Sequence, residues 1–248
     1  EMEDIIEVKN VSKSFGGVKA NIDISLKVKK GSITGIIGPN GCGKTTLFNS
    51  IVGYHPIDYG SIVFDNNEIS KLLVGDIARL GMLRTFQQTR IYSKMNCVDN
   101  MQISVSHRKD SKDSMFASRK GEIKERAENL LEFVGLYSKR NLISGDLSFG
   151  QQKLLEFAMA LMNDPKVLLL DEPTAGINPT LINGLIDRLR KANEELGITL
   201  CVIEHNMRVI MNLASHIYCL ANGKVLANGS PSELQEDQRV IDAYLGGH

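Results

Sequence analysis

The strongest constraint on this chain is a glycine-rich stretch at residues 38–46, which reads Gly-Pro-Asn-Gly-Cys-Gly-Lys-Thr-Thr. It fits the pattern G-x-x-x-x-G-K-[ST]. An apolar run at residues 33–37 precedes it and predicts a buried strand, and residues 47–52 open a helical pattern. A glycine turn that precedes a lysine by chance lacks this context, so a phosphate-binding loop is indicated. We therefore predict that the chain binds a nucleoside triphosphate.

The residue types of this loop suit a polyphosphate. Its glycines allow the backbone to curl, so that consecutive N–H groups point at phosphate oxygens. Lys44 is expected to place a positive charge near the β- and γ-phosphates, and Thr45 to offer its hydroxyl to Mg²⁺. The predicted nucleotide-binding residues of the loop are Gly38, Pro39, Asn40, Gly41, Cys42, Gly43, Lys44, Thr45 and Thr46.

A second motif places two carboxylates at the end of a strand. The apolar run at residues 167–170 leads directly to Asp171 and Glu172. A strand that delivers Asp171 to its carboxyl end brings this charge beside the phosphate-binding loop, where it can hold a water of Mg²⁺. Glu172, one residue later, points in a different direction and can reach the attacking water.

A motif upstream, Leu-Ser-Phe-Gly-Gln-Gln-Lys at residues 147–153, gives these features a family context. Taken together, they resemble the ABC-transporter ATPase family, whose signature is of the L-S-G-G-Q type. The resemblance runs from Ile5 to Leu245, nearly the whole chain. It implies an α/β fold: a P-loop NTPase (RecA-like) core with an antiparallel β-subdomain and an inserted α-helical subdomain.

The domain organisation we expect follows from this family and from changes of pattern along the chain. Residues 1–87 and 164–248 should form the catalytic core with the β-subdomain and a C-terminal helix, and residues 88–163 the helical signature subdomain. Alternating apolar and polar residues at 22–28 are typical of a half-buried antiparallel strand. A polar stretch at residues 107–120 predicts a surface loop. Further strands are expected at residues 5–9, 61–64, 82–86, 198–203 and 217–220, and helices from Pro179, after His205 and from Pro231.

Three more positions match family motifs. Phe15, in Ser-Phe-Gly-Gly, matches the aromatic residue that stacks on adenine, and the alternative is an ordinary core phenylalanine. Gln87, in Arg-Thr-Phe-Gln-Gln, matches the glutamine that contacts Mg²⁺, with Gln88 as the neighbouring alternative. His205 matches the switch histidine at the γ-phosphate, although a lone histidine at a strand end is more often a hydrogen-bonded structural residue.

The signature motif implies that the protein works in pairs. Ser148 and the backbone N–H groups of Gly150 and Gln151 lie at an expected helix start and form a second anion site. In the family this site faces the γ-phosphate that Lys44 of the other subunit holds. A twofold pair therefore sandwiches two ATP molecules and opens after hydrolysis.

For the chemistry, the resemblance implies ATP and Mg²⁺ as cofactors. Glu172 is expected to orient the attacking water as a base, and Thr45, Gln87 and Asp171 are expected around the metal ion. Lys44 and His205 would stabilise charge that develops on the transferred phosphoryl group.

Two positions depart from the family pattern. Phe149 stands in the signature where glycine is usual, and Asn178 stands where many relatives carry aspartate. The Asn178 amide can hydrogen-bond across an interface but carries no charge. A mechanism that requires a carboxylate at this position therefore does not apply to this chain.

Composition limits the partners and the compartment. The chain has 248 residues, with 29 basic and 29 acidic ones, so we expect no nucleic-acid partner. No apolar run approaches the roughly 18 residues needed to cross a bilayer, and no secretory h-region opens the chain. We expect the protein to be peripheral at the cytoplasmic face of the cell membrane, bound through permease subunits.

The four cysteines, Cys42, Cys97, Cys201 and Cys219, are scattered without a C-x-x-C pair. They predict neither a zinc site nor a disulfide framework, which suits a reducing cytoplasm. Cys42 lies inside the phosphate-binding loop, near helix N–H groups that favour a thiolate. A reactive Cys42 and an unreactive buried Cys42 are both open at this point.

Within the family, the chain most resembles the ATPases of branched-chain amino acid importers. The resembling stretches lie at residues 84–87, 175–179, 203–207 and 243–246. The alternatives are the lipopolysaccharide-export type of ATPase and another amino acid or amide importer ATPase. The implied partners are a second ABC ATPase subunit, identical or paralogous, membrane permease subunits and, indirectly, a solute-binding protein. The solute itself is chosen by those other subunits.

Overall fold

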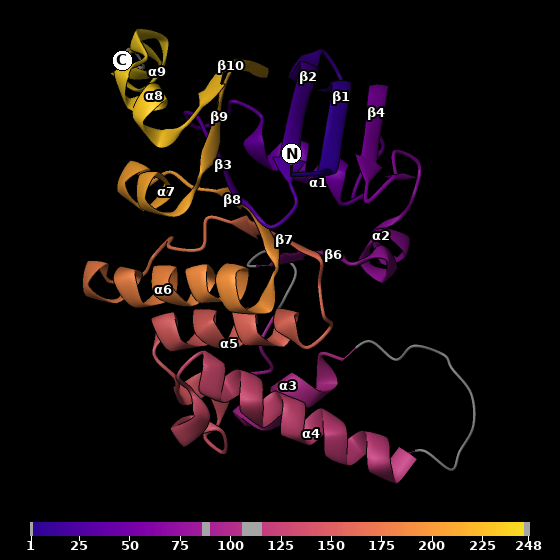
Figure 1. Cartoon of the computed structure of the whole chain (residues 1–248), viewed down its shortest axis with the longest axis vertical. Coiled ribbons are helices and arrows are strands. Elements are labelled where there is room, and N and C mark those ends of the chain that lie inside the picture. Colours follow the sequence, from indigo (N-terminus) through magenta and orange to yellow (C-terminus); the bar gives the residue numbers. More distant parts are fainter. Residues whose placement is uncertain (1, 86–89, 106–115, 246–248) are drawn as a thin grey trace. The chain divides into compact units, whose positions relative to one another are not determined.

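The computed structural model describes residues 2–85, 90–105 and 116–245 of the chain (Figure 1). It divides into two compact units. The first comprises Glu1–Arg84, Lys166–Pro173 and Arg190–His248, and the second comprises Thr85–Pro165 and Thr174–Leu189. The predicted helical subdomain, residues 88–163, falls within the second unit, to which Thr174–Leu189 also belongs.

The larger sheet of the first unit has six strands in the order β10-β9-β3-β8-β7-β6. Strands β3, β7 and β8 are buried at every residue, as continuous apolar runs in a covered parallel sheet should be. β8 pairs in parallel with both β3 and β7, so the carboxyl ends of these three strands lie at one edge. The strands are β3 (Ile33–Ile37), β6 (Met82–Thr85), β7 (Val167–Asp171), β8 (Thr199–Ile203), β9 (His216–Ala221) and β10 (Lys224–Gly229).

A second sheet in the first unit is antiparallel, in the order β2-β1-β4-β5. The predicted alternation is confirmed in β2, where Ile24, Leu26 and Val28 are buried and the residues between them are exposed. Side chains from both sheets join one core, which includes Phe48, Phe64 and Leu169. The strands are β1 (Asp4–Phe15), β2 (Val18–Lys29), β4 (Tyr59–Phe64) and β5 (Asn67–Glu68).

The helices of the first unit are mostly short. α8 begins at a capping box, in which Ser230 and Glu233 satisfy each other's backbone N–H groups, and α8 and α9 both contact β10 (Figure 1). The expected helix from Pro231 is therefore two helices. The bounds are α1 (Lys44–Ile51), α2 (Val74–Leu80), α7 (Met207–Leu213), α8 (Pro231–Glu236) and α9 (Gln238–Leu245).

The second unit is helical over most of its described length. It contains α3 (Cys97–Ile103), α4 (Phe116–Phe133), α5 (Phe149–Leu161), two short 3-10 turns (Tyr137–Lys139 and Ser144–Asp146) and the first part of α6 (Pro179–Leu196). A buried amide organises it: Asn100 donates to the Ser144 hydroxyl at 3.1 Å and accepts from the Tyr92 N–H at 2.7 Å. These bonds join the segment before α3 to the turn before α5.

The predicted surface loop at residues 107–120 is partly wrong. Residues 116–120 form the first turn of α4. Alanine, arginine and lysine in this stretch are good helix formers, so its polar character does not exclude a helix. Residues 107–115 lie outside the described part of the chain.

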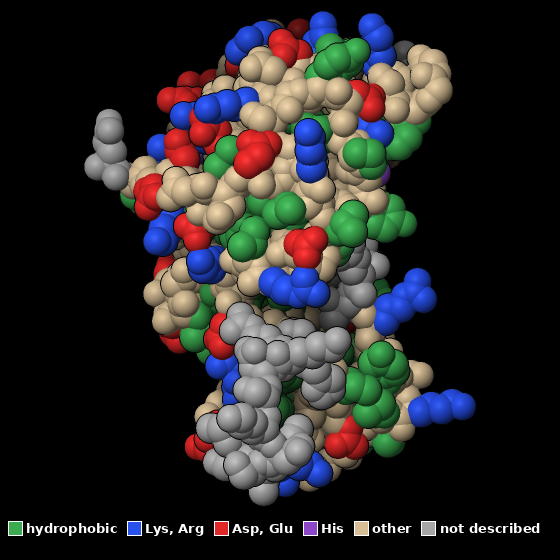
Figure 2. All heavy atoms as spheres, turned by 90° about the vertical axis from the view of Figure 1, so that its right-hand side faces the viewer, with side chains coloured by type: hydrophobic (Ala, Val, Ile, Leu, Met, Phe, Trp, Pro, Cys, Tyr) green, Lys and Arg blue, Asp and Glu red, His purple; other side chains and the backbone are tan. Residues whose placement is uncertain are grey.

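Charges of both signs are distributed over the surface. On the face in Figure 2, lysine and arginine side chains are interspersed with aspartate and glutamate. Over the described ranges, none of the helices combines the length and the apolar character needed to cross a bilayer.

Candidate functional site

The glycine-rich loop connects β3 to α1, as the sequence predicts. Two of its glycines are required by close packing as well as by backbone conformation. A Cβ on Gly38, where φ is 155°, would lie 2.4 Å from the carbonyl oxygen of Leu220. A Cβ on Gly43, where φ is 102°, would lie 2.4 Å from the carbonyl oxygen of Ala20. The loop is therefore held tightly between β2 and the end of β9.

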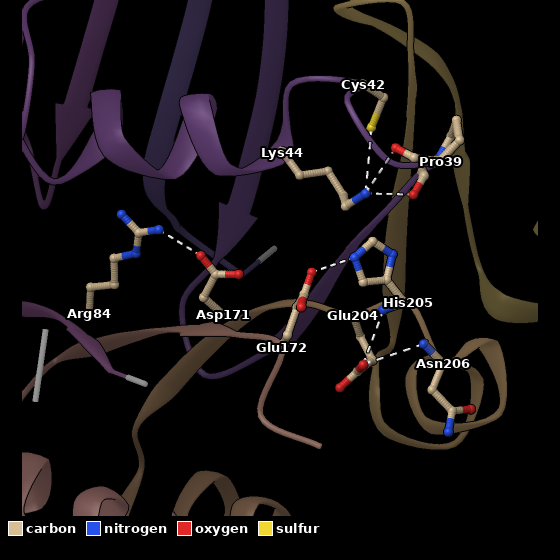
Figure 3. A network of polar contacts seen from close by, with 10 residues as sticks. Pro39, Cys42, Lys44, Arg84, Asp171, Glu172, Glu204, His205 and Asn206 are labelled. Carbon is tan, nitrogen blue, oxygen red and sulfur yellow. Dashed lines mark hydrogen bonds and ion pairs between the residues drawn. The ribbon is translucent and has the colours of Figure 1, made fainter. Parts of the chain in front are cut away.

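Lys44, the first residue of α1, directs its ammonium into this loop. Nζ donates to the carbonyl oxygen of Gly38 at 2.5 Å and to that of Pro39 at 3.2 Å, and it contacts Sγ of Cys42 at 3.6 Å (Figure 3). The residue is only 5% exposed. Its partners are neutral, so a phosphate placed in the loop would give the cation a stronger, charge-assisted partner. Thr45, in the first turn of α1, and Asn40 are exposed.

Cys42 is 3% exposed, which restricts access to its thiol, and the Lys44 ammonium lies 3.6 Å from its Sγ. Its reactivity stays a prediction. The other three cysteines are also free and buried. Burial raises the pKa of all three thiols: that of Cys97 is raised, that of Cys219 is raised to about 11, and that of Cys201 is raised to about 12. These thiols are poor nucleophiles at neutral pH, since the thiolate is the reactive form.

Asp171 ends β7 and is deeply buried. Its Oδ2 accepts from Nη2 of Arg84 at 2.6 Å, and both side chains are at most 2% exposed. Arg84 is not among the predicted site residues, although an arginine within the short strand Met82–Thr85 is a detectable signal. A buried charge of this kind needs a charged partner, and Asp171 supplies it.

Glu172 leaves the strand in a left-handed conformation, with φ of 50°. Its N–H donates to the carbonyl oxygen of Ile203 at 2.8 Å, and its carboxylate contacts Nε2 of His205. The kink turns Glu172 away from Asp171 and toward His205 (Figure 3). A non-glycine residue with positive φ is strained and often marks a functional position. The sequence prediction that the two acids point differently is confirmed.

The backbone around His205 is fixed by Glu204, which is not among the predicted site residues. Glu204 is 2% exposed, and its Oε1 accepts from the N–H groups of His205 at 3.1 Å and of Asn206 at 3.3 Å. Asn206 in turn caps α7 by accepting from the Val209 N–H at 3.4 Å. A buried glutamate directly after a strand, followed by histidine, is the signal that could have found it.

Phe15 lies at the end of β1 and is 49% exposed, which argues against an ordinary core role. The Phe15 and His55 rings pack edge to face, with their centroids 5.2 Å apart. Nζ of Lys13 lies 5.2 Å from the centroid of the Phe15 ring. Burial lowers the pKa of His55, which favours the neutral imidazole. Nδ1 of His55 also lies 3.4 Å from the hydroxyl oxygen of Ser50. The predicted stacking of Phe15 on a base stays a prediction.

The signature residues belong to the second unit. Ser148 caps α5 and forms a capping box with Gln151: the Ser148 hydroxyl accepts from the Gln151 N–H at 3.2 Å, and the Ser148 N–H donates to the Gln151 side chain at 3.0 Å. The hydroxyl proton of Ser148 stays available to donate to an anion. Gly150 lies next to Leu181: a Cβ there would meet the Leu181 side chain at 3.3 Å.

Local contacts accommodate the two departures from the family pattern. Phe149 is 51% exposed and covers Gly176, where an added Cβ would lie 3.1 Å from its ring. Asn178 precedes α6, and its side-chain oxygen accepts from the N–H and the hydroxyl of Thr180 at 3.1 and 3.0 Å. Gln87 and Gln88, the predicted metal contact and its alternative, lie outside the described residues.

The first unit thus brings Lys44, Asp171, Glu172 and His205 to the ends of neighbouring parallel strands, and comparison with known proteins identifies the family. The family model described as "ABC transporter" matches residues 22–175. The chain belongs to the ABC transporter family. A second model, "Branched-chain amino acid ATP-binding cassette transporter", matches residues 224–248 of this ABC ATP-binding subunit.

Two curated relatives are each 36% identical to this ABC subunit over 249 residues. One is the probable branched-chain amino acid transport ATP-binding protein LivG of Archaeoglobus fulgidus, with 98% of this chain and 95% of the relative covered. The other is the high-affinity branched-chain amino acid transport ATP-binding protein BraF of Pseudomonas aeruginosa, with 98% of each covered.

Solved structures confirm the fold of the ABC subunit. A nucleotide-free ATP-binding cassette from an ABC transporter superposes with a TM-score of 0.87 at 33% identity, covering 98% of this chain and 99% of the other. A dimeric bacterial ABC transporter cassette superposes with a TM-score of 0.77 at 26% identity, covering 91% and 98%. The predicted α/β P-loop ATPase fold is therefore confirmed.

Proposed function

We propose that this ABC ATP-binding subunit hydrolyses MgATP at the strand ends of its first unit and thereby energises uptake of branched-chain amino acids. The observation that carries the hydrolytic part is the convergence of Lys44, Asp171, Glu172 and His205 at the carboxyl ends of β3, β7 and β8. In open α/β sheets, this edge is where ligands bind.

The roles follow from the geometry. Lys44, already directed into the glycine loop, binds the phosphates. Glu172 is held by His205 and is exposed over 35% of its side chain, so it can accept a proton from an attacking water. His205 orients Glu172 through Nε2, and in its doubly protonated form, in which both ring nitrogens are donors, it can also donate to the γ-phosphate through Nδ1. Phe15 supplies an exposed aromatic surface for the base.

The donor set near Asp171 fits Mg²⁺, which prefers carboxylate and hydroxyl oxygens with several waters. Asp171 and Thr45 of the described residues, together with Gln87, would hold the ion. When bound, Mg²⁺ neutralises charge on the phosphate oxygens. A single buried carboxylate beside a phosphate loop is typical of a site for Mg²⁺ that binds together with its nucleotide. A site that holds the ion with protein ligands alone would need more of them.

The second unit contributes to a different subunit's site in this proposal. Ser148, Gly150 and Gln151 lie at the N-terminus of a 13-residue helix, a position that favours an anion. Their partner would be the γ-phosphate bound by the Lys44 loop of a second ABC ATPase subunit, identical or paralogous. The similarity to a dimeric cassette supports this arrangement.

Branched-chain amino acids are the proposed solute because the two relatives are branched-chain amino acid transport ATP-binding proteins. The family model that matches residues 224–248 supports the same solute. The membrane partners would be permease subunits, which place the protein at the cytoplasmic face of the cell membrane and couple it to a solute-binding protein. A lipopolysaccharide-export ATPase or another amino acid or amide importer ATPase is the alternative assignment.

The test is ATP hydrolysis by the assembled transporter in reconstituted membranes. A binding protein loaded with leucine, isoleucine or valine should raise the hydrolysis rate above that seen with the empty binding protein. A Glu172→Gln transporter provides the background rate. Indifference to all three amino acids, or co-purification with lipopolysaccharide-export permeases, would move the assignment to the alternative.

A further inference from the structure

Arg84 is a buried charge that the mechanism above does not use. It extends from β6, and its side chain is 1% exposed. Nη2 donates to Oδ2 of Asp171 at 2.6 Å, while Nη1 contacts the side-chain oxygen of Asn49. The guanidinium also lies 5.9 Å from the ring centroid of Phe48. Since Phe48 and Asn49 belong to α1, one side chain joins the acid of β7 to the helix that begins at Lys44.

The shape of the guanidinium matters for what this contact does. It is planar and presents its donors in a fixed fork, so two acceptors in different directions hold it still. Arg84 has these two acceptors in Asp171 and Asn49. In Figure 3 the second oxygen of Asp171 points away from Arg84, toward the side where Glu172 and His205 lie. The orientation of the Asp171 carboxylate is therefore set by Arg84.

We propose that Arg84 is a positioning residue for metal-bound nucleotide: it holds Oδ2 of Asp171 so that the other oxygen faces Mg²⁺. This inference rests on the proposed function, since it concerns the same hydrolytic site. Partners that orient a metal-binding carboxylate typically change metal affinity by about 10–100-fold when they are lost. Arg84 does not contact the phosphates in this proposal and acts only through Asp171.

A purely structural ion pair makes a different prediction. A buried pair contributes little net stability compared with apolar residues of the same volume, but removal of one partner leaves an uncompensated charge. A structural role would therefore lower the thermal midpoint and leave the dependence on Mg²⁺ unchanged. The two roles are separated by measuring metal dependence in a folded variant.

The variant is Arg84→Lys, which keeps the positive charge and loses the fork. Binding of a fluorescent ATP analogue is titrated with Mg²⁺, and its affinity is also measured in EDTA. We expect the half-saturating Mg²⁺ concentration to rise about tenfold, in line with other partners of metal-binding carboxylates. The affinity in EDTA should not change, because the Lys44 loop is intact. An unchanged Mg²⁺ half-saturation in folded Arg84→Lys overturns the proposal.

Two further variants keep the test decisive. Asn49→Ala removes the second anchor while the ion pair remains, so it should shift the Mg²⁺ half-saturation in the same direction but less, even if Arg84→Lys fails to fold. No shift in Asn49→Ala, with Arg84→Lys unfolded, overturns the proposal. Lys166→Met is the control, because Lys166 also makes a 2.6 Å ion pair, with Asp65, but is 55% exposed. It should leave metal dependence unchanged.

Failure of the proposed function would look different. A wild-type protein that shows no Mg²⁺-dependent ATP hydrolysis contradicts the hydrolytic site itself. A wild type that hydrolyses MgATP, together with Arg84→Lys and Asn49→Ala variants of normal Mg²⁺ dependence, contradicts only the positioning role of Arg84.

Discussion

The two units of this protein prepare their functional residues in different ways. In the first unit, Lys44 and Asp171 are buried, and Asp171 is held by Arg84, which lies 87 positions away in the sequence. In the second unit, Ser148 is exposed at a helix start and exchanges two hydrogen bonds with Gln151, three residues later. This contrast fits the proposal that the first unit orients its catalytic groups through its own contacts, whereas the signature residues would offer an anion site to a second subunit.

The largest expected effect on ATP turnover comes from a substitution of Glu172, which belongs to the first unit. Glu172→Gln should lower ATP turnover by about 10²–10⁴, the usual value of a positioned base. Nucleotide binding should persist, because Lys44 and Ser148 are untouched, and an ATP-bound dimer should accumulate. Turnover and dimer formation by size-exclusion chromatography are the measurements. Hydrolysis near the wild-type rate would remove Glu172 from the mechanism.

Substitutions of Ser148 separate its capping role from its anion-binding role. Ser148→Asp keeps a good cap and should keep stability, yet it should lower turnover on the order of a hundredfold, because like charges about 4 Å apart repel by about 4 kcal/mol before screening. Ser148→Ala should cost about 1 kcal/mol of unfolding free energy through the lost cap. If the alanine variant hydrolyses more slowly than the aspartate variant, Ser148 is only a cap.

The tight packing of the glycine loop gives a smaller effect. In Gly38→Ala, the new Cβ must move a backbone carbonyl that lies 2.4 Å away, so the free energy of unfolding should fall by about 1–3 kcal/mol. ATP affinity should weaken as well. Gly17→Ala is the control, since nothing lies within 4 Å of its Cβ position. Equal denaturation curves for the two variants would contradict the packing argument.

The smallest effect concerns pH. Burial lowers the pKa of His55, so the unfolded chain binds this proton at a higher pH than the folded chain does. Stability should therefore decrease as the pH falls from the unfolded pKa of about 6.5 through the lower folded value. His55→Gln should flatten this part of the curve of thermal midpoint against pH. A curve as steep as that of the wild type would show that His55 is not the responsible group.

The sequence predicts the first unit's motifs well because each is local. The loop, the apolar strand 33–37 and the change of direction between Asp171 and Glu172 are properties of short segments. Arg84 was missed because its partner lies 87 positions away and only the folded sheet brings them together. Strand β10 was missed for a related reason: its pairing with β9 across Gly223 gives half-buried residues without a clear alternation.

In the second unit, by contrast, local features were not predicted. Its family motif identified Ser148, but the reciprocal bond with Gln151 was not predicted, although Ser-x-x-Gln is a capping-box pattern. The helix start at residue 116 was hidden by neighbouring polar residues. Both features are local: a capping-box pattern at Ser148 and good helix formers at residues 117, 119 and 120.

The central claim is that Ser148 of one chain completes the Lys44 loop of another. Two differently tagged chains are mixed with MgATP, and dimers are captured through one tag and quantified through the other. With Lys44→Ala on one chain and Ser148→Arg on the other, both lesions fall in one composite site and one site stays intact. With both substitutions on the same chain, each composite site is damaged. We predict ATP-dependent dimerisation and residual hydrolysis in the first arrangement and a loss of both in the second, whereas equal behaviour of the two would show that each site is complete within a single chain.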